Sequence, residues 1–62
     1  MKANFTCICT FSNGDVIRNY FTNKNPEEIA NYYTGHKFNL GVDADNMQIC
    51  TKVEFIYEEN KV

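Results

Sequence analysis

The sequence predicts an α+β fold, in which one helix packs on one face of a three-stranded antiparallel sheet in the order β-β-α-β. Residues 3–12 and 47–57 alternate between apolar and polar side chains, which is the period of a strand. An Asn-Gly dipeptide separates the first of these segments from a second strand-like run. An Asn-Pro dipeptide opens a short helical pattern. The 62 residues have room for one domain, expected to span 1–62.

The first two strands are predicted to form a hairpin. The Asn-Gly dipeptide at 13–14 favours a two-residue type I′ turn, so residues 15–22 should form the returning strand. A two-residue loop pairs Phe11 with Val16 and leaves Arg18 as a charged misfit on the covered face. The other side chains expected on that face are Phe5, Cys7, Cys9, Phe11, Val16 and Tyr20.

The opposite face of the predicted sheet is too apolar for a plain solvated surface. It carries Ile8, Ile17 and Phe21 from the hairpin and Ile56 from the last strand. A single helix covers one face of a sheet, so these side chains have no cover from the chain itself. Chains this short bury only ~60% of their unfolded surface and are often stabilised by self-association. We therefore expect a homodimer with these four residues at its interface.

The helix is expected to begin after Asn25 and to end near Thr34. Asparagine is a good N-cap because its side chain accepts a hydrogen bond from a backbone N–H of the first turn. Glu27 and Glu28 lie in that first turn, where the helix dipole favours negative charge. Gly35 can supply the left-handed residue that follows many helices.

The last strand shows the clearest alternation. The odd-numbered positions of 47–57 are expected to face the core, which turns Cys50 outward and leaves Ile56 exposed. Residues 36–46 are interpreted as a loop, although their alternating apolar residues could also form a short irregular strand. Residues 58–62 form a polar tail.

The cysteines are interpreted as inert thiols in a reducing compartment. Three cysteines, Cys7, Cys9 and Cys50, cannot form a closed disulfide framework. Together with the single His36, they also lack the paired spacing of a structural zinc site. The acidic run at 43–46 lacks the glycine and the distal glutamate of an EF-hand loop. We expect no metal and no cofactor.

The composition points away from catalysis, nucleic acids and membranes. There is one histidine and no glycine-rich phosphate loop, and so few elements leave little room to enclose a pocket of about 300 Å³. A net charge of −2 disfavours direct binding to a nucleic-acid backbone. The sequence has neither the roughly 20 apolar residues of a membrane span nor the apolar run of a signal peptide. We expect a cytoplasmic binding protein without enzymatic activity.

Acidic residues and tyrosines are the clearest binding features. Glu27 and Glu28 stand at the start of the helix, with Tyr32 one turn further on. A second acidic group lies along and after the last strand: Glu54, Glu58 and Glu59. Helix capping and protection of a sheet edge would explain each residue singly. An acidic surface that engages a basic groove, such as the DNA-binding face of an enzyme, would explain them together.

The layout of the chain resembles one phage family. The resemblance rests on the order of elements, on "SNGD" followed by "IRNYF", and on "EEIANYYTG". Over nearly its whole length the chain is similar to the small dimeric uracil-DNA glycosylase inhibitors of Bacillus podophages. The resemblance implies a homodimer whose two helices occupy the DNA-binding cleft of the host enzyme and imitate DNA. It also implies a hydrophobic pocket between the helices, which captures the apolar side chain that probes the minor groove.

Carried over to this chain, the resemblance makes Glu27 and Glu28 stand in for phosphates. The position of a helix phenylalanine in that family falls to Ile29 or Tyr32. The partner-binding residues expected on this basis are Glu27, Glu28, Ile29, Asn31, Tyr32 and Tyr33. Two alternatives stay open: an inhibitor of another host nucleic-acid enzyme, such as an anti-CRISPR protein, and a small structural or regulatory dimerisation module.

Overall fold

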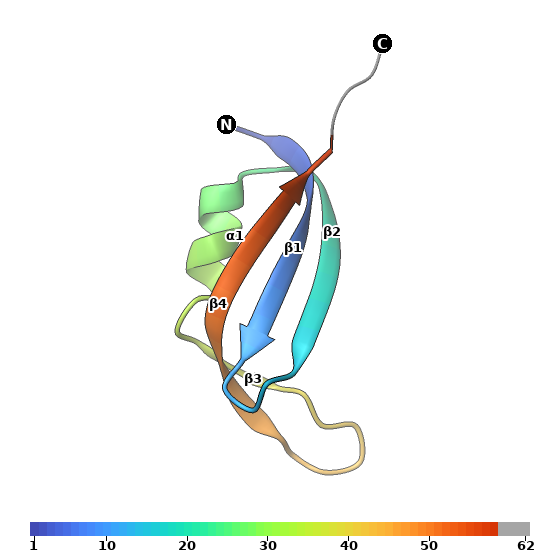
Figure 1. Cartoon of the computed structure of the whole chain (residues 1–62), viewed down its shortest axis with the longest axis vertical. Coiled ribbons are helices and arrows are strands. Elements are labelled where there is room, and N and C mark those ends of the chain that lie inside the picture. Colours follow the sequence, from blue (N-terminus) through green and yellow to red (C-terminus); the bar gives the residue numbers. More distant parts are fainter. Residues whose placement is uncertain (59–62) are drawn as a thin grey trace.

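The computed structural model describes residues 1–58, which fold into four strands and one helix (Figure 1). The elements are β1 (Ala3–Phe11), β2 (Val16–Lys24), α1 (Pro26–Tyr33), β3 (Lys37–Asn39) and β4 (Met47–Tyr57). The antiparallel sheet has the strand order β2-β1-β4-β3, and α1 packs against β1 and β4. The predicted α+β class and antiparallel sheet are confirmed. The prediction of three strands is wrong, because β3 forms within the expected loop and pairs with the start of β4.

The turn between β1 and β2 is one residue longer than predicted. The backbone N–H of Phe11 donates to the carbonyl of Asp15 (2.8 Å), and that of Gly14 donates to the carbonyl of Phe11 (2.8 Å). Three residues, 12–14, therefore form the loop. Gly14, and not Asn13, has a positive φ (+92°), so the turn is a type I turn closed by a left-handed glycine.

This extra loop residue turns the side chains of residues 16–21 of β2 to the opposite face of the sheet. The register shifts again near the end of the hairpin, where Ala3 pairs with Lys24. Cys9 pairs with Ile17, and Phe5 pairs with Phe21. Ile17 and Phe21 therefore join the covered face and pack against the core, where the rings of Phe5 and Phe21 lie 5.6 Å apart. The prediction that Ile17 and Phe21 lie at an uncovered dimer surface is wrong for this reason.

The alternate residues of β2 lie on the open face, by which we mean the face of β2, β1 and β4 that is turned away from α1. Val16 and Tyr20 were expected in the core but are 50% and 57% exposed. Arg18, the misfit of the predicted register, is exposed between them. Ile8 and Ile56 lie on the open face as predicted. The open face therefore carries four apolar or aromatic side chains among threonines and charged residues, and its members from β2 differ from the expected ones.

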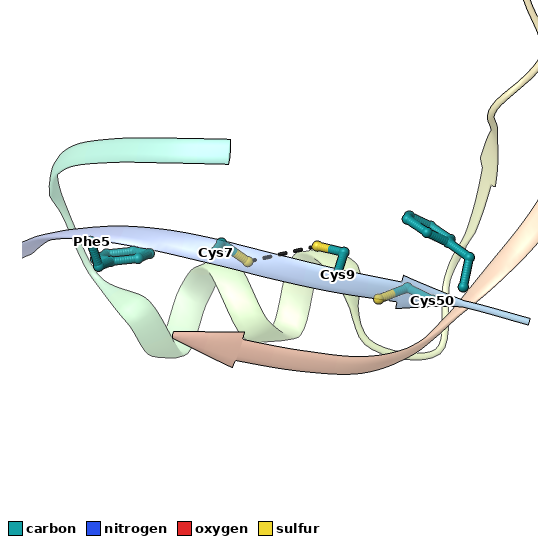
Figure 2. Close-up of a cluster of buried hydrophobic side chains, with 5 residues drawn as sticks. Phe5, Cys7, Cys9 and Cys50 are labelled. Carbon is teal, nitrogen blue, oxygen red and sulfur yellow. Dashed lines mark hydrogen bonds between the residues drawn. The ribbon is translucent and has the colours of Figure 1, made fainter. Parts of the chain in front are cut away.

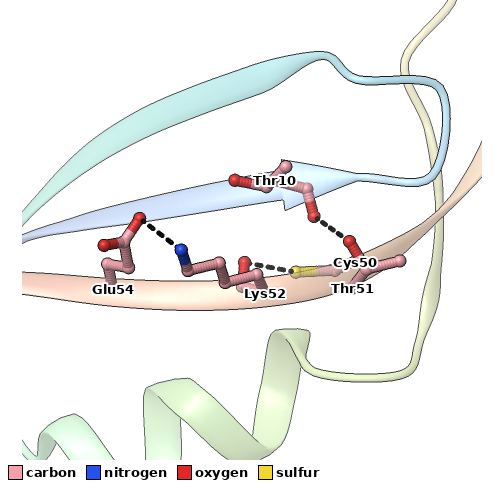
Figure 3. A network of polar contacts seen from close by, with 5 residues as sticks. All are labelled: Thr10, Cys50, Thr51, Lys52 and Glu54. Atoms are coloured by element: carbon pink, nitrogen blue, oxygen red, sulfur yellow. Dashed lines mark hydrogen bonds and ion pairs between the residues drawn. The ribbon is translucent and has the colours of Figure 1, made fainter.

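A β-bulge interrupts the pairing of β4 with β1. Thr10 pairs with Lys52, whereas Phe11 pairs with Cys50, so Thr51 is the extra residue of β4. The Thr51 hydroxyl donates to the carbonyl oxygen of Thr10 (3.2 Å), which holds the bulge against β1 (Figure 3). The bulge shifts the alternation of β4 by one residue.

The shift exchanges the two faces in the first half of β4. Cys50, expected to face outward, is fully buried, while Met47 and Ile49, expected in the core, are exposed. After the bulge the predicted alternation holds, and Val53 and Phe55 pack against the core.

The core lies between α1 and the covered face of the sheet. Its buried side chains are Phe5, Cys7, Cys9, Phe11 and Cys50 (Figure 2). The Sγ atoms of Cys7 and Cys9 are 3.7 Å apart. Burial, aided by this hydrogen bond, raises the pKa of Cys9 to about 12. A protonated, buried thiol is a poor nucleophile, which agrees with the interpretation of these cysteines as inert.

The helix α1 begins and ends close to the predicted positions. The side chain of Asn25 accepts a hydrogen bond from the backbone N–H of Glu27 (3.0 Å), and Pro26 occupies the first helical position. Gly35 follows the helix with a φ of +79°, and its backbone N–H donates to the carbonyl of Cys50 (2.8 Å). The caps therefore fix both the length of α1 and its attachment to β4.

Candidate functional site

The outward side of α1 is the candidate site. Four of the six predicted partner-binding residues are exposed or half-exposed on it: Glu27, Glu28, Asn31 and Tyr32. Glu27 and Asn31 are four residues apart, as are Glu28 and Tyr32, so the four side chains form two adjacent rows along the helix. A rise of 1.5 Å per residue places Tyr32 roughly 6 Å along the axis from Glu28. The site thus has an acidic end and an aromatic end.

The other two predicted residues attach the helix to the sheet. Ile29 and Tyr33 are half-buried and pack against the core. The Tyr33 hydroxyl accepts a hydrogen bond from the side-chain amide of Asn19 on β2 (3.2 Å). Burial raises the pKa of Tyr33. These two side chains hold α1 in place, and only their exposed edges can reach a partner.

Tyr32 is held in position by neighbouring rings, although it is 63% exposed. Its ring centroid lies 5.0 Å from that of Tyr33, edge to face, and 5.7 Å from that of Phe38 on β3. Phe38 in turn lies 6.0 Å from the buried ring of Phe11. An exposed ring that is already fixed loses little conformational freedom on binding, which favours affinity. Sequence reasoning missed Phe38 as a support of the site, although the alternation within 36–46 contained the signal.

An open hollow of about 520 Å³ lies beside the start of α1. Its lining residues are Met1, Ala3, Asn25, Pro26, Glu27, Phe55 and Tyr57. β3 pairs only with residues 47–49, so the later part of β4 has no strand beyond it and borders the helix start instead. The sequence did not reveal this hollow, because it forms only where the start of β1 and the end of β4 meet α1.

The lining of the hollow combines aromatic surface with one carboxylate. Phe55 and Tyr57 have ring centroids 6.1 Å apart, and Glu27 is an exposed member of the lining. Such a combination suits an apolar side chain, or a lysine or arginine whose stem packs on the rings while its cation meets the carboxylate. The hollow therefore extends the acidic end of the candidate site.

Of the second predicted acidic group, Glu54 and Glu58 do not join this site. Glu54 lies on the open face, where its carboxylate is 3.6 Å from the ammonium of Lys52 (Figure 3). Glu58 accepts a hydrogen bond from the hydroxyl of Tyr20 (2.8 Å), and this bond raises the pKa of Tyr20. Glu59 lies outside the described residues. Within residues 1–58, the acidic site is therefore the start of α1.

Metal ligands, membrane spans and known relatives do not add to this site. Among residues 1–58, no group of three or more His, Cys, Asp or Glu side chains is arranged to hold a metal ion. In the same residues, no helix has the length and apolar character needed to cross a membrane. Comparisons with protein-family models, with curated proteins and with solved structures found no match to this chain. Function is therefore inferred from the surfaces described above and from the resemblance in sequence.

Proposed function

We propose that the chain is a stoichiometric inhibitor of uracil-DNA glycosylase, which binds in the DNA-binding cleft of that enzyme in the cytoplasm of a phage-infected host. The observation that carries the proposal is the exposure of Glu27, Glu28 and Tyr32 together on one short, well-capped helix. The choice of target enzyme comes from the resemblance in sequence. A chain of this kind acts by occupying the cleft, without catalysis.

The proposed contacts follow from the chemistry of a cleft that binds DNA. Such a cleft carries cationic side chains placed to meet phosphates, and the carboxylates of Glu27 and Glu28 offer them negative charge. Tyr32 supplies a rigid aromatic anchor of the type that dominates many interfaces. The hollow beside Glu27 would receive the apolar side chain with which the enzyme probes the minor groove. It lies within one chain, whereas the resemblance implies a pocket between two helices.

The test is a uracil-excision assay with a purified bacterial uracil-DNA glycosylase. We expect excision from uracil-containing DNA to stop once the chain is in molar excess. The double variant Glu27→Lys/Glu28→Lys should raise the inhibition constant at least ~100-fold, because two attractive contacts become repulsive at a cost of several kcal/mol. The single variants Glu27→Lys and Glu28→Lys should each weaken inhibition, whereas Asp43→Lys makes the same single charge reversal in an exposed loop and should inhibit normally.

Undiminished excision at molar excess would refute the choice of target. A pull-down from host lysate would then show whether another nucleic-acid enzyme, such as a CRISPR nuclease, is bound through the same helix. The open face favours a second candidate function, a structural or regulatory dimerisation module. In that case the charge reversals on α1 would leave the self-association of the chain unchanged. They would lower only the stability of α1, because the two carboxylates that interact favourably with the helix dipole are lost.

A further inference from the structure

We infer that Asn13 is a latent deamidation site, which the turn between β1 and β2 protects in the folded chain and which reacts only when this turn opens. The observations are the Asn13-Gly14 dipeptide, its exposure to water and the hydrogen bonds that occupy both reacting groups. The modification needs no enzyme and no reagent other than water. It does not depend on the identity of a target enzyme.

The dipeptide contains the atoms for an intramolecular reaction. The backbone nitrogen of Gly14 attacks the side-chain carbon Cγ of Asn13, the bond from Cγ to Nδ2 breaks, and the Nδ2 group leaves as ammonia with the proton of the attacking nitrogen. Water then opens the cyclic imide at either carbonyl. One opening gives aspartate, and the other gives isoaspartate, in which the main chain runs through Cβ and Cγ. Of the asparagines in the sequence, only Asn13 precedes a glycine, which has no side chain to obstruct the attack.

Access to water does not limit the reaction in the folded chain. Asn13 and Gly14 are both exposed. A methyl group built on Gly14 would meet no atom within 4 Å, so the surrounding structure does not crowd the ring closure either. Any protection must therefore come from the hydrogen bonds of the turn.

These hydrogen bonds hold both reacting groups. The backbone N–H of Gly14, which carries the nucleophile, donates to the carbonyl oxygen of Phe11 (2.8 Å). The side chain of Asn13 is bound to Asp15 at both ends. Its Oδ1 accepts from the backbone N–H of Asp15 (3.0 Å), and its Nδ2 donates to the Asp15 carboxylate (2.8 Å). An ionised carboxylate has no proton to give to the departing nitrogen. Attack requires the nitrogen to approach Cγ closely and in line, so the turn must open first.

The extent of protection follows from the number of bonds that must break. An ordinary hydrogen bond contributes a factor of roughly 2–10 to an equilibrium. Opening breaks the two bonds of the Asn13 side chain and the one that Gly14 donates. We therefore expect deamidation to be at least ~10-fold slower in the folded chain than in the unfolded chain.

Deamidation should also weaken the turn in which it occurs. The donor Nδ2 is replaced by an oxygen, so a second carboxylate faces that of Asp15 at hydrogen-bonding range, and like charges this close repel. Isoaspartate in addition adds a backbone atom to the loop that the hydrogen bond from Phe11 to Asp15 closes. The modification therefore accumulates in chains whose turn has opened and hinders its return to the native conformation.

The test compares the full chain in native buffer with the full chain in concentrated guanidinium chloride, both mildly alkaline. Tandem mass spectrometry locates the exchange of NH2 for OH and distinguishes isoaspartate by its fragments. Asn13 should be the main site, and its conversion should be at least ~10-fold slower in native buffer.

Variants of Asp15 test the source of the protection. Asp15→Ala should speed conversion in native buffer roughly 2–10-fold, because Nδ2 loses its acceptor. Asp15→Asn keeps an acceptor oxygen and should react nearly as slowly as wild type. Asp43→Ala makes the same change as Asp15→Ala in another exposed loop and should have no effect. All these chains should react at the same rate in guanidinium chloride, where the turn is absent.

Four outcomes would overturn the inference. Equal rates for the wild-type chain in the two solutions would refute the protection, and this comparison needs no variant to fold. Absence of conversion at Asn13 in guanidinium chloride would refute the reactive site. An unchanged rate in Asp15→Ala, with the variant folded by circular dichroism, would refute the role of the carboxylate. Asn13→Asp reproduces one product and should lower the midpoint of thermal unfolding, so an unchanged midpoint would contradict the weakened turn.

Discussion

Replacing two neighbouring aromatic residues of β2 tests the register of the first hairpin. Phe21→Ala removes a ring that packs on Phe5 on the covered face. Tyr20→Ala removes a ring that is 57% exposed on the open face. The two-residue turn predicted from the sequence would reverse these positions, so the two registers predict opposite orders of stability.

The magnitudes follow from burial. Truncating a buried phenylalanine costs about 3–5 kcal/mol, and for the mostly buried Phe21 we expect about 3 kcal/mol. Less than half of the Tyr20 side chain is buried. At about 25 cal/mol per Å² of buried apolar surface, its replacement by alanine should lower the free energy of unfolding by about 1 kcal/mol. A domain of 62 residues is stable by roughly 3–9 kcal/mol, so Phe21→Ala should remove a third or more of the total.

The assay is urea denaturation followed by far-ultraviolet circular dichroism. With a slope near ~1 kcal/mol per M, the midpoint should fall by about 3 M for Phe21→Ala and about 1 M for Tyr20→Ala. Tyr20→Phe serves as a control that removes only the hydrogen bond to Glu58.

An equal or larger loss for Tyr20→Ala would refute the three-residue turn. The assignment of Val16, Arg18 and Tyr20 to the open face would then have to be abandoned as well, since it depends on this register.

Three further predictions concern the helix cap, a loop and the thiols. Asn25→Ala should lower the free energy of unfolding by about 1 kcal/mol in urea titrations, while Asn25→Ser should retain most of it. Gly41→Ala would place a methyl group on the carbonyl oxygen of Ala44, so it should shift the NMR amide signals of residues 40–46 and cost about 1–3 kcal/mol. The pKa of Cys9 is about 12 in the folded chain against an ordinary 9.0, so the unfolded chain loses this proton first as the pH rises. Stability should therefore decline between about pH 9 and about pH 12, with a shallower decline for Cys9→Ala, and an unchanged slope in that variant would contradict the assignment.

The helix and the covered face of β1 could be predicted because their signals are local. Asn25 and Gly35 specify the two ends of α1 through hydrogen bonds and backbone conformations that involve only their neighbours. The alternation of Phe5 to Phe11 needs no partner strand to be recognised. Features of this kind are decided within a few residues, and the structure agrees with them.

The register of β2 could not be decided locally, because Ser-Asn-Gly fits either a two-residue or a three-residue turn. The choice depends on whether Ile17 and Phe21, or Val16 and Tyr20, face the core. The sequence did contain a clue, since Arg18 was a charged misfit on the covered face in the two-residue register. Burying an arginine without a partner costs far more than exchanging these apolar residues, and this cost favours the longer turn.

The candidate site was predicted in part for similar reasons. Glu27, Glu28 and Tyr32 could be assigned to the helix surface because the caps place α1 accurately. The hollow beside Glu27 and the support of Tyr32 by Phe38 depend on how β3 and β4 meet the helix. The alternation within 36–46 indicated an inward-facing Phe38, but which residues of the helix it meets became visible only in the folded chain.

The bulge at Thr51 lets β4 carry one residue more than β1 opposite it while the residues on both sides keep their faces. Thr51 is exposed, so most side chains should be accepted there. Deleting it would leave Phe11 opposite Cys50 and Thr10 opposite Lys52 without a bulge, so Cys50 would stay in the core and Met47 and Ile49 would stay exposed. Related chains should therefore vary at this position both in residue type and in whether the extra residue is present, because its loss does not turn its neighbours to the other face.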